Sequence, residues 1–448
     1  MPTHAQLKPE PWTKTQVPMS RLFAFFLPLG LSAGLVTISH VIINSTLTRA
    51  PNAEAVIASY AIAMSLLGIT EKPAILLRQT CSALVRDRVS FRAMAAIALY
   101  VFASIFAMGL LISYTELGRA IFRTVFGISG ESLQETLDVY RILMFVSLFS
   151  GLRCLFHGII ISNQRTAWLT IGMIIRLVIM YGLAQYFIAT DNVNSGQVGA
   201  VIFLVGMIVE SMVALWEGRS LLKKKIPEKI EDHPITSRKQ IFGFYRPLLY
   251  YSLLAVIVGP AINAMLGKTS SMELAIASFA IALSLAQLVQ SFFTYVHQIV
   301  LNFYKLDKRQ VIKFTVLMSP LPALLIGILA YSPLGSWFMQ YGMGANEALT
   351  AASLDTLRVF MIMSLIFPWL DFFNGMVMLI GQTKIMVWSQ SANVIITVLI
   401  LFVFVWLAPG WNGMIGALAQ SLGFLAELIV VLFALRHLSR EPGGLLKN

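Results

Sequence analysis

The chain has 448 residues, of which 57% are hydrophobic and 12% are charged, and its formal net charge is +12 at pH 7. Soluble domains are about half apolar and a quarter charged, so this composition excludes an ordinary soluble globule and predicts a polytopic membrane protein. The apolar runs lack the alternation of a membrane barrel, so the expected fold class is all-α. Lys and Arg that anchor a cytosolic membrane face explain the positive charge better than nucleic acid does, so no nucleic-acid partner is expected.

Twelve transmembrane helices are expected, and they follow a polar, Pro-rich segment at residues 1–20. No small-residue cleavage site follows the first apolar run, so this segment is interpreted as a cytosolic tail before an uncleaved helix. Several apolar runs exceed the ~20 residues that cross a bilayer, so tilt or cytosolic extension is expected. The expected spans are 21–46, 54–83, 93–114, 134–162, 167–189, 196–218, 240–266, 272–303, 312–332, 351–381, 385–408 and 412–436.

Basic residues are divided unevenly between the two sets of loops. With the N-terminus inside, the outer loops hold only Arg49, Arg119, Arg123 and Lys268, whereas the inner loops and tails hold many more. This asymmetry predicts a multi-pass protein of the cytoplasmic membrane with both termini cytosolic. One long charged stretch is taken as the boundary between two lobes. The expected organisation is a tail (1–20), an N-lobe (21–222), a cytosolic linker (223–239), a C-lobe (240–437) and a second cytosolic tail (438–448).

Two membrane-like segments are nearly identical, IASYAIAMSLL at 57–67 and IASFAIALSLA at 276–286, and an offset of 219 aligns them. An offset of 217 aligns LDVYRILMFVSL at 137–148 with LDTLRVFMIMSL at 354–365. The halves therefore share six spans in the same order and orientation. This pattern predicts two six-helix lobes related by a parallel pseudo-two-fold axis along the membrane normal.

Such a repeat favours a transporter, because a site between two lobes can open to either side of the membrane. Channels usually repeat around a ring. A membrane enzyme would need a cluster of His, Asp or Cys, and the sequence has no such cluster, no metal-ligand spacing and no nucleophile motif. An enzyme, a cofactor and a metal site are therefore not expected, and the choice of H⁺ or Na⁺ as a coupling ion stays open.

Ionisable and polar residues inside spans are costly, and the repeat divides them into two sets. Residues present in both lobes more often serve the shared scaffold, and residues present in one lobe more often serve a substrate. The shared set comprises the i, i+3 pairs Asp138–Arg141 and Asp355–Arg358, the acids Glu210 and Glu427, the amides Asn44 and Asn263, and the prolines Pro28 and Pro247. We expect the two ion pairs to form along their helices, and the prolines to kink the first helix of each lobe. For the glutamates, proton or cation binding and helix capping stay open, and for the asparagines interhelical hydrogen bonding is favoured.

The unshared set is mostly basic and lies mostly in the first lobe. In the second span Glu71, Lys72 and Arg78 surround Pro73, a helix-kinking residue. The matching positions of the second lobe hold Gln290, Ser291 and His297.

The fourth and fifth spans add Arg153, His157 and Arg176, and the tenth span carries Asp371 and Asn374. Arg153 and His157 are i, i+4 neighbours and share a helix face.

These basic side chains would attract a carboxylate or a phosphate, with Arg offering a bidentate fork. The competing interpretation is internal pairing, of Lys72 with Glu71 and of Arg153 with Asp371, with Arg78 extending to the inner surface. The candidate substrate-binding residues are Lys72, Arg78, Arg153, His157, Arg176, Asn44, Asn263 and Asn374. The candidate coupling or gating residues are Glu71, Asp371, Glu210, Glu427, Pro28, Pro73 and Pro247.

Short segments along the whole chain, namely FFLPLG, IASYAIAMSLL…KP…LLR, FHGIII, FYRPL and GFLAE, resemble the progressive ankylosis family within the MATE and flippase (MOP) superfamily. The resemblance implies export of small anions such as pyrophosphate, nucleotides or citrate. It touches Pro28, Ser59, Pro73, Arg78, His157 and Glu427. Cation-exporting members typically place an acid in the first membrane helix, and the first span here has none, which argues against that sodium or proton site.

The leading hypothesis is a secondary transporter that moves an anionic organic solute or an anionic lipid outward by alternating access. A multidrug exporter of organic cations and a lipid-linked oligosaccharide flippase are the alternatives. The expected partners are membrane lipids and the small solute, and the expected state is a monomer.

Overall fold

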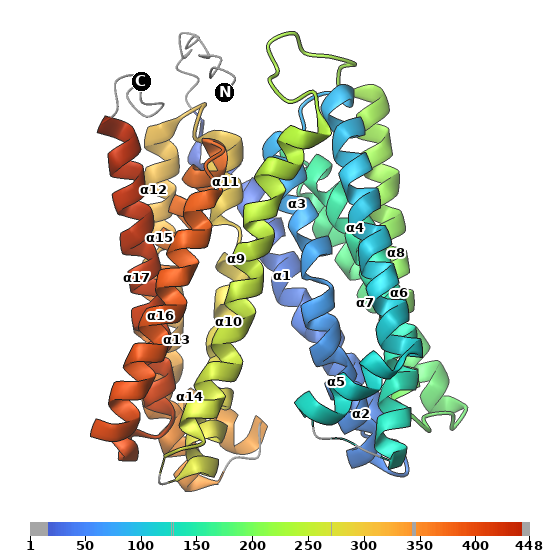
Figure 1. The fold of residues 1–448 in the computed structure, drawn as a ribbon, viewed down its shortest axis with the longest axis vertical. Coiled ribbons are helices and arrows are strands. Elements are labelled where there is room, and N and C mark those ends of the chain that lie inside the picture. Colours follow the sequence, from blue (N-terminus) through green and yellow to red (C-terminus); the bar gives the residue numbers. More distant parts are fainter. Residues whose placement is uncertain (1–16, 127, 129, 270, 343–345, 441–448) are drawn as a thin grey trace. The chain divides into compact units, whose positions relative to one another are not determined.

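The computed structural model describes residues 17–126, 128, 130–269, 271–342 and 346–440 (Figure 1). Most of the two expected cytosolic tails, 1–16 and 441–448, lies outside this part of the chain. By packing, the chain divides into two compact units. The N-terminal unit is Phe25–Pro260, and the C-terminal unit is Ala261 onward together with the segment before Phe25. The division of the chain into two lobes at the linker 223–239 is based on the sequence repeat, and it stays a prediction.

Helices make up the regular structure of the described residues, which confirms the all-α prediction. The N-terminal unit consists of α1 (Met19–Leu47), α2 (Ala53–Thr70), α3 (Lys72–Leu84), α4 (Arg88–Tyr114), α5 (Glu116–Phe126), α6 (Gly130–Ser162), α7 (Ala167–Ala189), α8 (Gly196–Lys224) and α9 (Arg238–Leu266). The first residues of α1 and the last residues of α9 belong to the other unit. Those of the C-terminal unit are α10 (Met272–Phe293), α11 (Val296–Phe303), α12 (Lys308–Met318), α13 (Pro320–Tyr331), α14 (Pro333–Trp337), α15 (Glu347–Leu379), α16 (Lys384–Leu407) and α17 (Gly413–Arg440). A π-helix (Phe338–Gly342) follows α14, and a 3₁₀ turn (Pro409–Trp411) follows α16.

In the described part of the chain, eleven helices are long and apolar enough to cross a membrane, or twelve if one bent pair is counted as a single span. The bent pair is α2 and α3, which meet at an angle of 42° around Glu71. Pro73 stands in the first turn of α3, where its missing N–H leaves no helical hydrogen bond unmade. The twelve expected spans are therefore found, and the kink expected near Pro73 is a break between two helices.

The predicted repeat is also visible in the packing of each unit. A Cβ atom on Gly158 of α6 would lie 2.5 Å from Cys81 Cβ of α3, and one on Gly375 of α15 would lie 2.9 Å from Val300 Cβ of α11. The offsets 217 and 219 that align the sequences link these two pairs. Only glycine permits so close an approach of two helices. The same close helix contact therefore occurs once in each unit.

Two ion pairs repeat in the same way. Asp138 pairs with Arg141 on α6, and Asp355 pairs with Arg358 on α15, as the sequence predicted. Each guanidinium also lies over a tyrosine ring at the same offset, 5.1 Å from the Tyr114 centroid and 4.9 Å from the Tyr331 centroid. These residues belong to the scaffold that both halves share.

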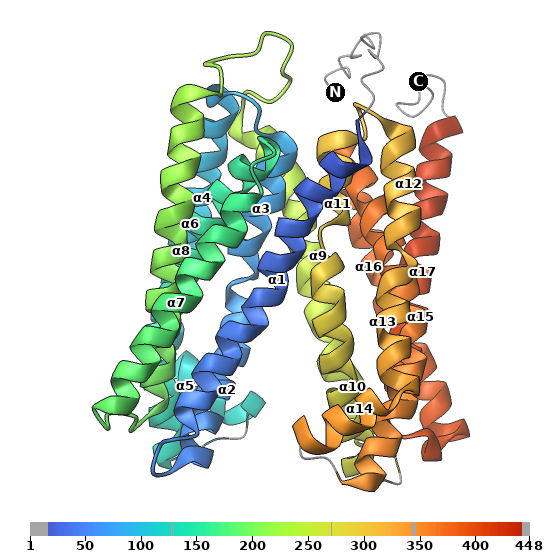
Figure 2. The same cartoon turned by 180° about the vertical axis from the view of Figure 1, so that it is seen from behind.

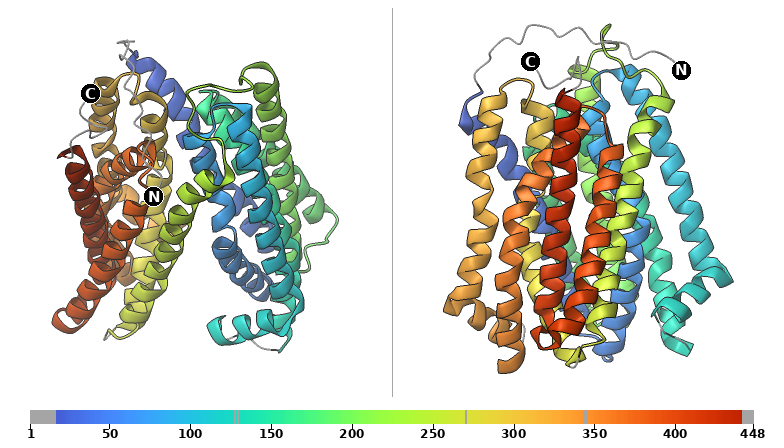
Figure 3. Two further views of the ribbon diagram at one scale, coloured as in Figure 1. Left: turned by 45° about the horizontal axis from the view of Figure 1, so that its top comes forward. Right: turned by 60° about the vertical axis from the view of Figure 1, so that its left-hand side comes forward.

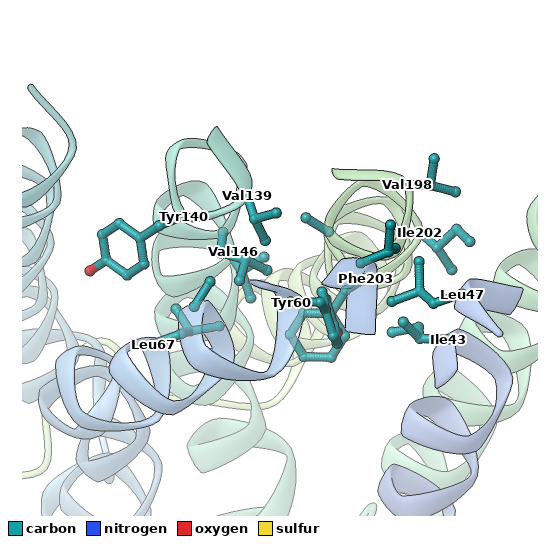
Figure 4. Packing of buried hydrophobic residues seen from close by; sticks show 14 of the residues in the cluster. Ile43, Leu47, Tyr60, Leu67, Val139, Tyr140, Val146, Val198, Ile202 and Phe203 are labelled. Carbon is teal, nitrogen blue, oxygen red and sulfur yellow. The ribbon is translucent and has the colours of Figure 1, made fainter. Parts of the chain in front are cut away.

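The apolar core of the N-terminal unit lies between α1, α2, α6 and α8 (Figure 4). Ile43, Tyr60, Val146 and Ile202 are buried there. Ala63 and Ser59 of the repeated segment are buried too, which lets these helices approach closely. Helix α6 packs against α3 and α8, and α7 packs against α8 (Figure 2), so these helices bring their polar side chains together inside the unit.

The connection between α8 and α9 is held against the turn between α3 and α4 (Figure 3). The Asp87 carboxylate accepts hydrogen bonds from the backbone N–H of Ser90 at 2.8 Å and of Ile230 at 3.0 Å. The Arg88 guanidinium donates to the carbonyl of Leu222 at 2.8 Å. The His233 ring contacts the Leu84 carbonyl at 2.9 Å. The charged linker is therefore fixed to the N-terminal unit.

Candidate functional site

The centre of the N-terminal unit is a buried carboxylate that two arginines share. Glu210 of α8 accepts a hydrogen bond from Arg153 of α6, with Nη1 3.0 Å from both carboxylate oxygens. Its Oε2 also accepts from Nη1 of Arg176 on α7 at 2.8 Å. The Arg176 and Glu210 side chains are each 1% exposed, and the Arg153 side chain is 12% exposed. Three of the predicted site residues are thus joined in one network.

This network carries more positive than negative charge, because two guanidiniums face one carboxylate. Buried charges persist in proteins when they are paired and hydrogen-bonded. Within the described residues, Nε of Arg153 and Nη2 of Arg176 are buried without a hydrogen-bond partner. The network therefore keeps an unused capacity to donate hydrogen bonds to an acceptor.

Aromatic and polar side chains from α1, α2 and α8 surround Arg176. Its guanidinium lies 5.0 Å from the centre of the Phe203 ring, and the His40 ring lies 5.6 Å from the same centre. Arg176 also interacts electrostatically with His40 and with Tyr60. The Tyr60 hydroxyl is buried with no partner among the described atoms. This group makes the interior of the unit polar at the level of Arg176.

The break between α2 and α3 brings further charge to α6. Glu71 interacts electrostatically with Arg153, and Arg78 interacts with His157. His157 is 4% exposed, and its Nδ1 has no hydrogen-bond partner in the described part of the chain. The Tyr245 hydroxyl of α9 donates to the carbonyl of Pro73 at 2.8 Å, which ties α9 to the first turn of α3.

Lys72 is the exception among these charges. It is half-buried at the first position of α3, and in the described residues its ammonium makes no ion pair or hydrogen bond, with Glu71 or with any other group. The internal pairings considered from the sequence are thus not those that form. Lys72 has no carboxylate, and Arg153 is bound to Glu210.

The C-terminal unit repeats one part of this network with a neutral donor. Asn393 of α16 donates to Oε2 of Glu427 on α17 at 2.8 Å. Asn393 and Glu427 stand at the offset of 217 from Arg176 and Glu210. The glutamate is therefore common to both halves, and the donor at the position matched to Arg176 is a cation in the first half and an amide in the second.

Asp371 is engaged at the break between α10 and α11. It accepts the backbone N–H of His297 at 2.8 Å, and its other oxygen lies 3.0 Å from Nδ1 of the His297 ring. It thereby holds the first turn of α11 in place. One turn further along α15, Asn374 is buried, and its side-chain oxygen has no partner among the described residues.

The remaining candidates lie apart from these networks. Asn44 and Asn263 are exposed, and the structure, where it describes the chain, gives their side chains no interhelical hydrogen bond. Pro28 and Pro247 lie inside helices that continue on both sides of them. The carbonyl of Pro28 accepts the Thr170 hydroxyl of α7 at 2.7 Å.

Reasoning from the sequence missed the role of Tyr60. The offset of 219 places it opposite Phe279, so the hydroxyl occurs in one half only. That difference was the signal that could have found it. Over the described residues, no group of three His, Cys, Asp or Glu side chains is placed to hold a metal ion.

No protein-family model and no curated protein matches the sequence. Solved structures do match. A MOP superfamily transporter from Pyrococcus furiosus, described by the reversed polarity of its binding pocket, is 16% identical with a TM-score of 0.74, over 94% of this chain and 96% of that one. A MATE transporter in complex with the molecule MaL6 is 18% identical with a TM-score of 0.72, over 94% and 96%. An outward-facing multidrug resistance MATE transporter is 17% identical with a TM-score of 0.71, over 93% and 97%.

These similarities show the fold. The chain has the two-lobe helical fold of the MATE transporters, and it is a multi-pass membrane protein. The MATE-like fold expected from the sequence is therefore confirmed.

Proposed function

We propose that the chain is a secondary transporter of the cytoplasmic membrane that moves an anionic organic solute outward by alternating access. The solute would carry phosphate or carboxylate groups. The transporter role rests on the fold that the chain shares with MATE transporters. The anionic class rests on the positive charge of four side chains of the N-terminal unit, Lys72, Arg78, Arg153 and Arg176, which are called the cluster below.

The observation that carries the anionic class is a comparison of the two halves at matched positions. The first half has four permanent cations, Lys72, Arg78, Arg153 and Arg176, among the candidate residues. The second half has Ser291, His297, Leu370 and Asn393 at those positions. The same helices therefore pack without these cations in the second half. Because the fold does not demand these cations, we assign them to ligand binding, either by direct contact or by positioning Glu210.

The proposed roles differ with the burial of each side chain. Lys72 and Arg153 would contact the solute, because Lys72 has no counter-charge in the described residues and Arg153 keeps an accessible edge. Arg176 is fully buried and would hold Glu210 in place rather than touch the solute. When an anion binds Arg153, Glu210 can still be neutralised by Arg176. Such an exchange avoids leaving a buried carboxylate without a partner.

The resemblance to the progressive ankylosis family supports the same class of solute, with pyrophosphate, nucleotides and citrate as candidates. The reversed pocket polarity described for the Pyrococcus furiosus protein fits a fold that carries binding sites of different charge. Glu71, Asp371, Glu210 and Glu427 are the candidates for coupling to H⁺ or Na⁺. Both termini would be cytosolic, and the working unit would be a monomer.

The test is efflux from proteoliposomes loaded with labelled pyrophosphate, a nucleotide or citrate. We expect the wild type to release at least one of these anions, and Arg153→Ala and Lys72→Ala to lose most of that release. Arg119→Ala is the matched control, because it removes an exposed arginine that pairs with Glu116 on the short helix α5. Normal release by both cluster variants would show that the basic side chains do not bind the solute.

Efflux of organic cations is the second candidate, because one of the similar structures is a multidrug resistance transporter. It would require Asp371, Glu71 or Glu427 as the binding carboxylate. Asp371 already binds the first turn of α11, and Glu427 accepts the Asn393 amide. The same vesicles loaded with an organic cation separate the two candidates, since the cation exporter should fail in Asp371→Asn and not in Lys72→Ala.

A further inference from the structure

A second basic site lies away from this cluster, where α4 and α9 begin. A cavity of about 240 Å³ is lined there by Val89, Arg92 and Ala93 of α4 and by Thr236 and Arg238 at the start of α9. The linker that forms one wall is fixed, since the Gln240 side chain accepts from the backbone N–H of Thr236 at 3.0 Å. The cavity therefore belongs to an ordered part of the N-terminal unit.

The two charged side chains that line this cavity, Arg92 and Arg238, are both cationic. Arg88 and Arg92 share one carboxylate, Glu228, at 3.1 Å and 2.5 Å. Arg238 reaches the Tyr100 hydroxyl at 3.5 Å, and this contact adds no negative charge. Of the two arginines that line the cavity, only Arg92 has a carboxylate partner in the described residues, and it shares that carboxylate with Arg88. The Arg92 side chain is 71% exposed, so its remaining donors are accessible.

An exposed apolar surface continues along the same two helices. Tyr100 lies two turns after Arg92 on α4, and Phe242 lies one turn after Arg238 on α9. The Tyr100 side chain and its neighbour Leu99 are 60% and 67% exposed, and Phe242 is 48% exposed. The cavity and these exposed apolar side chains, called the apolar seam below, thus lie along the same two helices. This arrangement matches a ligand that has an anionic head and a hydrocarbon tail.

We propose that this site binds one anionic glycerophospholipid, with its phosphate between Arg92 and Arg238 and an acyl chain along Tyr100 and Phe242. Tyrosines of this kind favour the membrane–water interface. The predicted orientation of the chain places the site in the cytosolic leaflet, where anionic lipids attract basic segments. A soluble phosphate compound would use the cavity and leave the seam uncovered.

The experiment is a titration of the detergent-solubilised full chain with phosphatidylglycerol, read by native mass spectrometry. Phosphatidylcholine is the neutral comparison, and glycerol 3-phosphate is the probe without a tail. Each basic group near an anionic lipid contributes a factor of about five in affinity. We expect Arg92→Ala and Arg238→Ala each to weaken phosphatidylglycerol binding about fivefold, and Glu228→Gln to strengthen it by a similar factor. Arg119→Ala is the control and should leave binding unchanged.

Phe242→Ser tests the seam, because its side chain is exposed and its replacement leaves the core intact. It should weaken phosphatidylglycerol binding and have no effect on glycerol 3-phosphate. Two results would overturn the proposal. One is binding of glycerol 3-phosphate as tight as that of phosphatidylglycerol. The other is a preference for phosphatidylglycerol over phosphatidylcholine that persists unchanged in Arg92→Ala and Arg238→Ala.

Discussion

Replacement of Glu210 by glutamine tests the buried network most sharply. The substitution removes the carboxylate that pairs with both Arg153 and Arg176, at distances of 3.0 and 2.8 Å. Loss of one partner of a buried ion pair costs about 3–5 kcal/mol, because the remaining charge stays without a partner. Arg176 is 1% exposed and bears this cost in full, whereas Arg153, which is 12% exposed, can relax partly toward solvent. We therefore expect the free energy of unfolding to fall by about 3–5 kcal/mol.

The second half supplies the matched control. Glu427→Gln keeps a side-chain oxygen that can accept the Asn393 amide, so its cost should be smaller than that of Glu210→Gln. Denaturant or SDS titration of both variants, read by circular dichroism, gives the two free energies. Adding Arg176→Asn to Glu210→Gln removes the most buried unpaired charge and should recover part of the loss. Equal losses in Glu210→Gln and Glu427→Gln would refute the account of the network.

Three further substitutions follow from the same structure. Arg153→Leu leaves Glu210 paired with Arg176, so its loss of stability in the same titration should be smaller than that of Glu210→Gln, and the variant should lose anion efflux; a loss as large as that of Glu210→Gln would make Arg153 structural. Tyr60→Phe removes a buried hydroxyl that has no partner in the described residues, so thermal unfolding should shift upward or stay unchanged, and a marked decrease would reveal a bond to that hydroxyl. For Asp87, burial raises the pKa of the carboxyl, but hydrogen bonds from the Ser90 hydroxyl and from the backbone N–H of Ile230 and Ser90 outweigh burial and hold the pKa below its usual value. The ionised form therefore stabilises the linker above pH ~4, and this contribution is lost as the pH falls through the lowered pKa. Asp87→Asn should raise hydrogen exchange at the Ile230 amide at pH 7, and equal exchange in variant and wild type would contradict the role of this carboxylate.

The sequence predicts the spans well because a membrane helix needs a long apolar run, and such a run can be recognised in the sequence directly. Pairs along one helix, such as Asp138–Arg141, were also predictable, since residues three apart share a face. The pair of Arg153 with Glu210 was not. It depends on how α6 and α8 are rotated about their axes, and an apolar run does not encode that rotation.

Two other features escaped prediction for related reasons. The helix α5 is short and amphipathic, so its composition reads as a polar outer loop. The contact of Asp371 with His297 forms between α15 and the break before α11, and the position of that break cannot be taken from the first half. In the first half the break between helices lies at Glu71, which aligns with Gln290. In the second half the break lies later, at Tyr295.

The central claim is that the cations of the first half bind an anionic solute. It is tested most directly by Lys72→Ser combined with Arg153→Leu, which gives the first half the residues that the second half has at those positions. Proteoliposomes loaded with a labelled anion and with an organic cation are compared for this variant and the wild type. The account predicts anion release by the wild type and none by the variant, with the protein still folded. Anion release that persists in the variant, or release of the organic cation alone by the wild type, would contradict it.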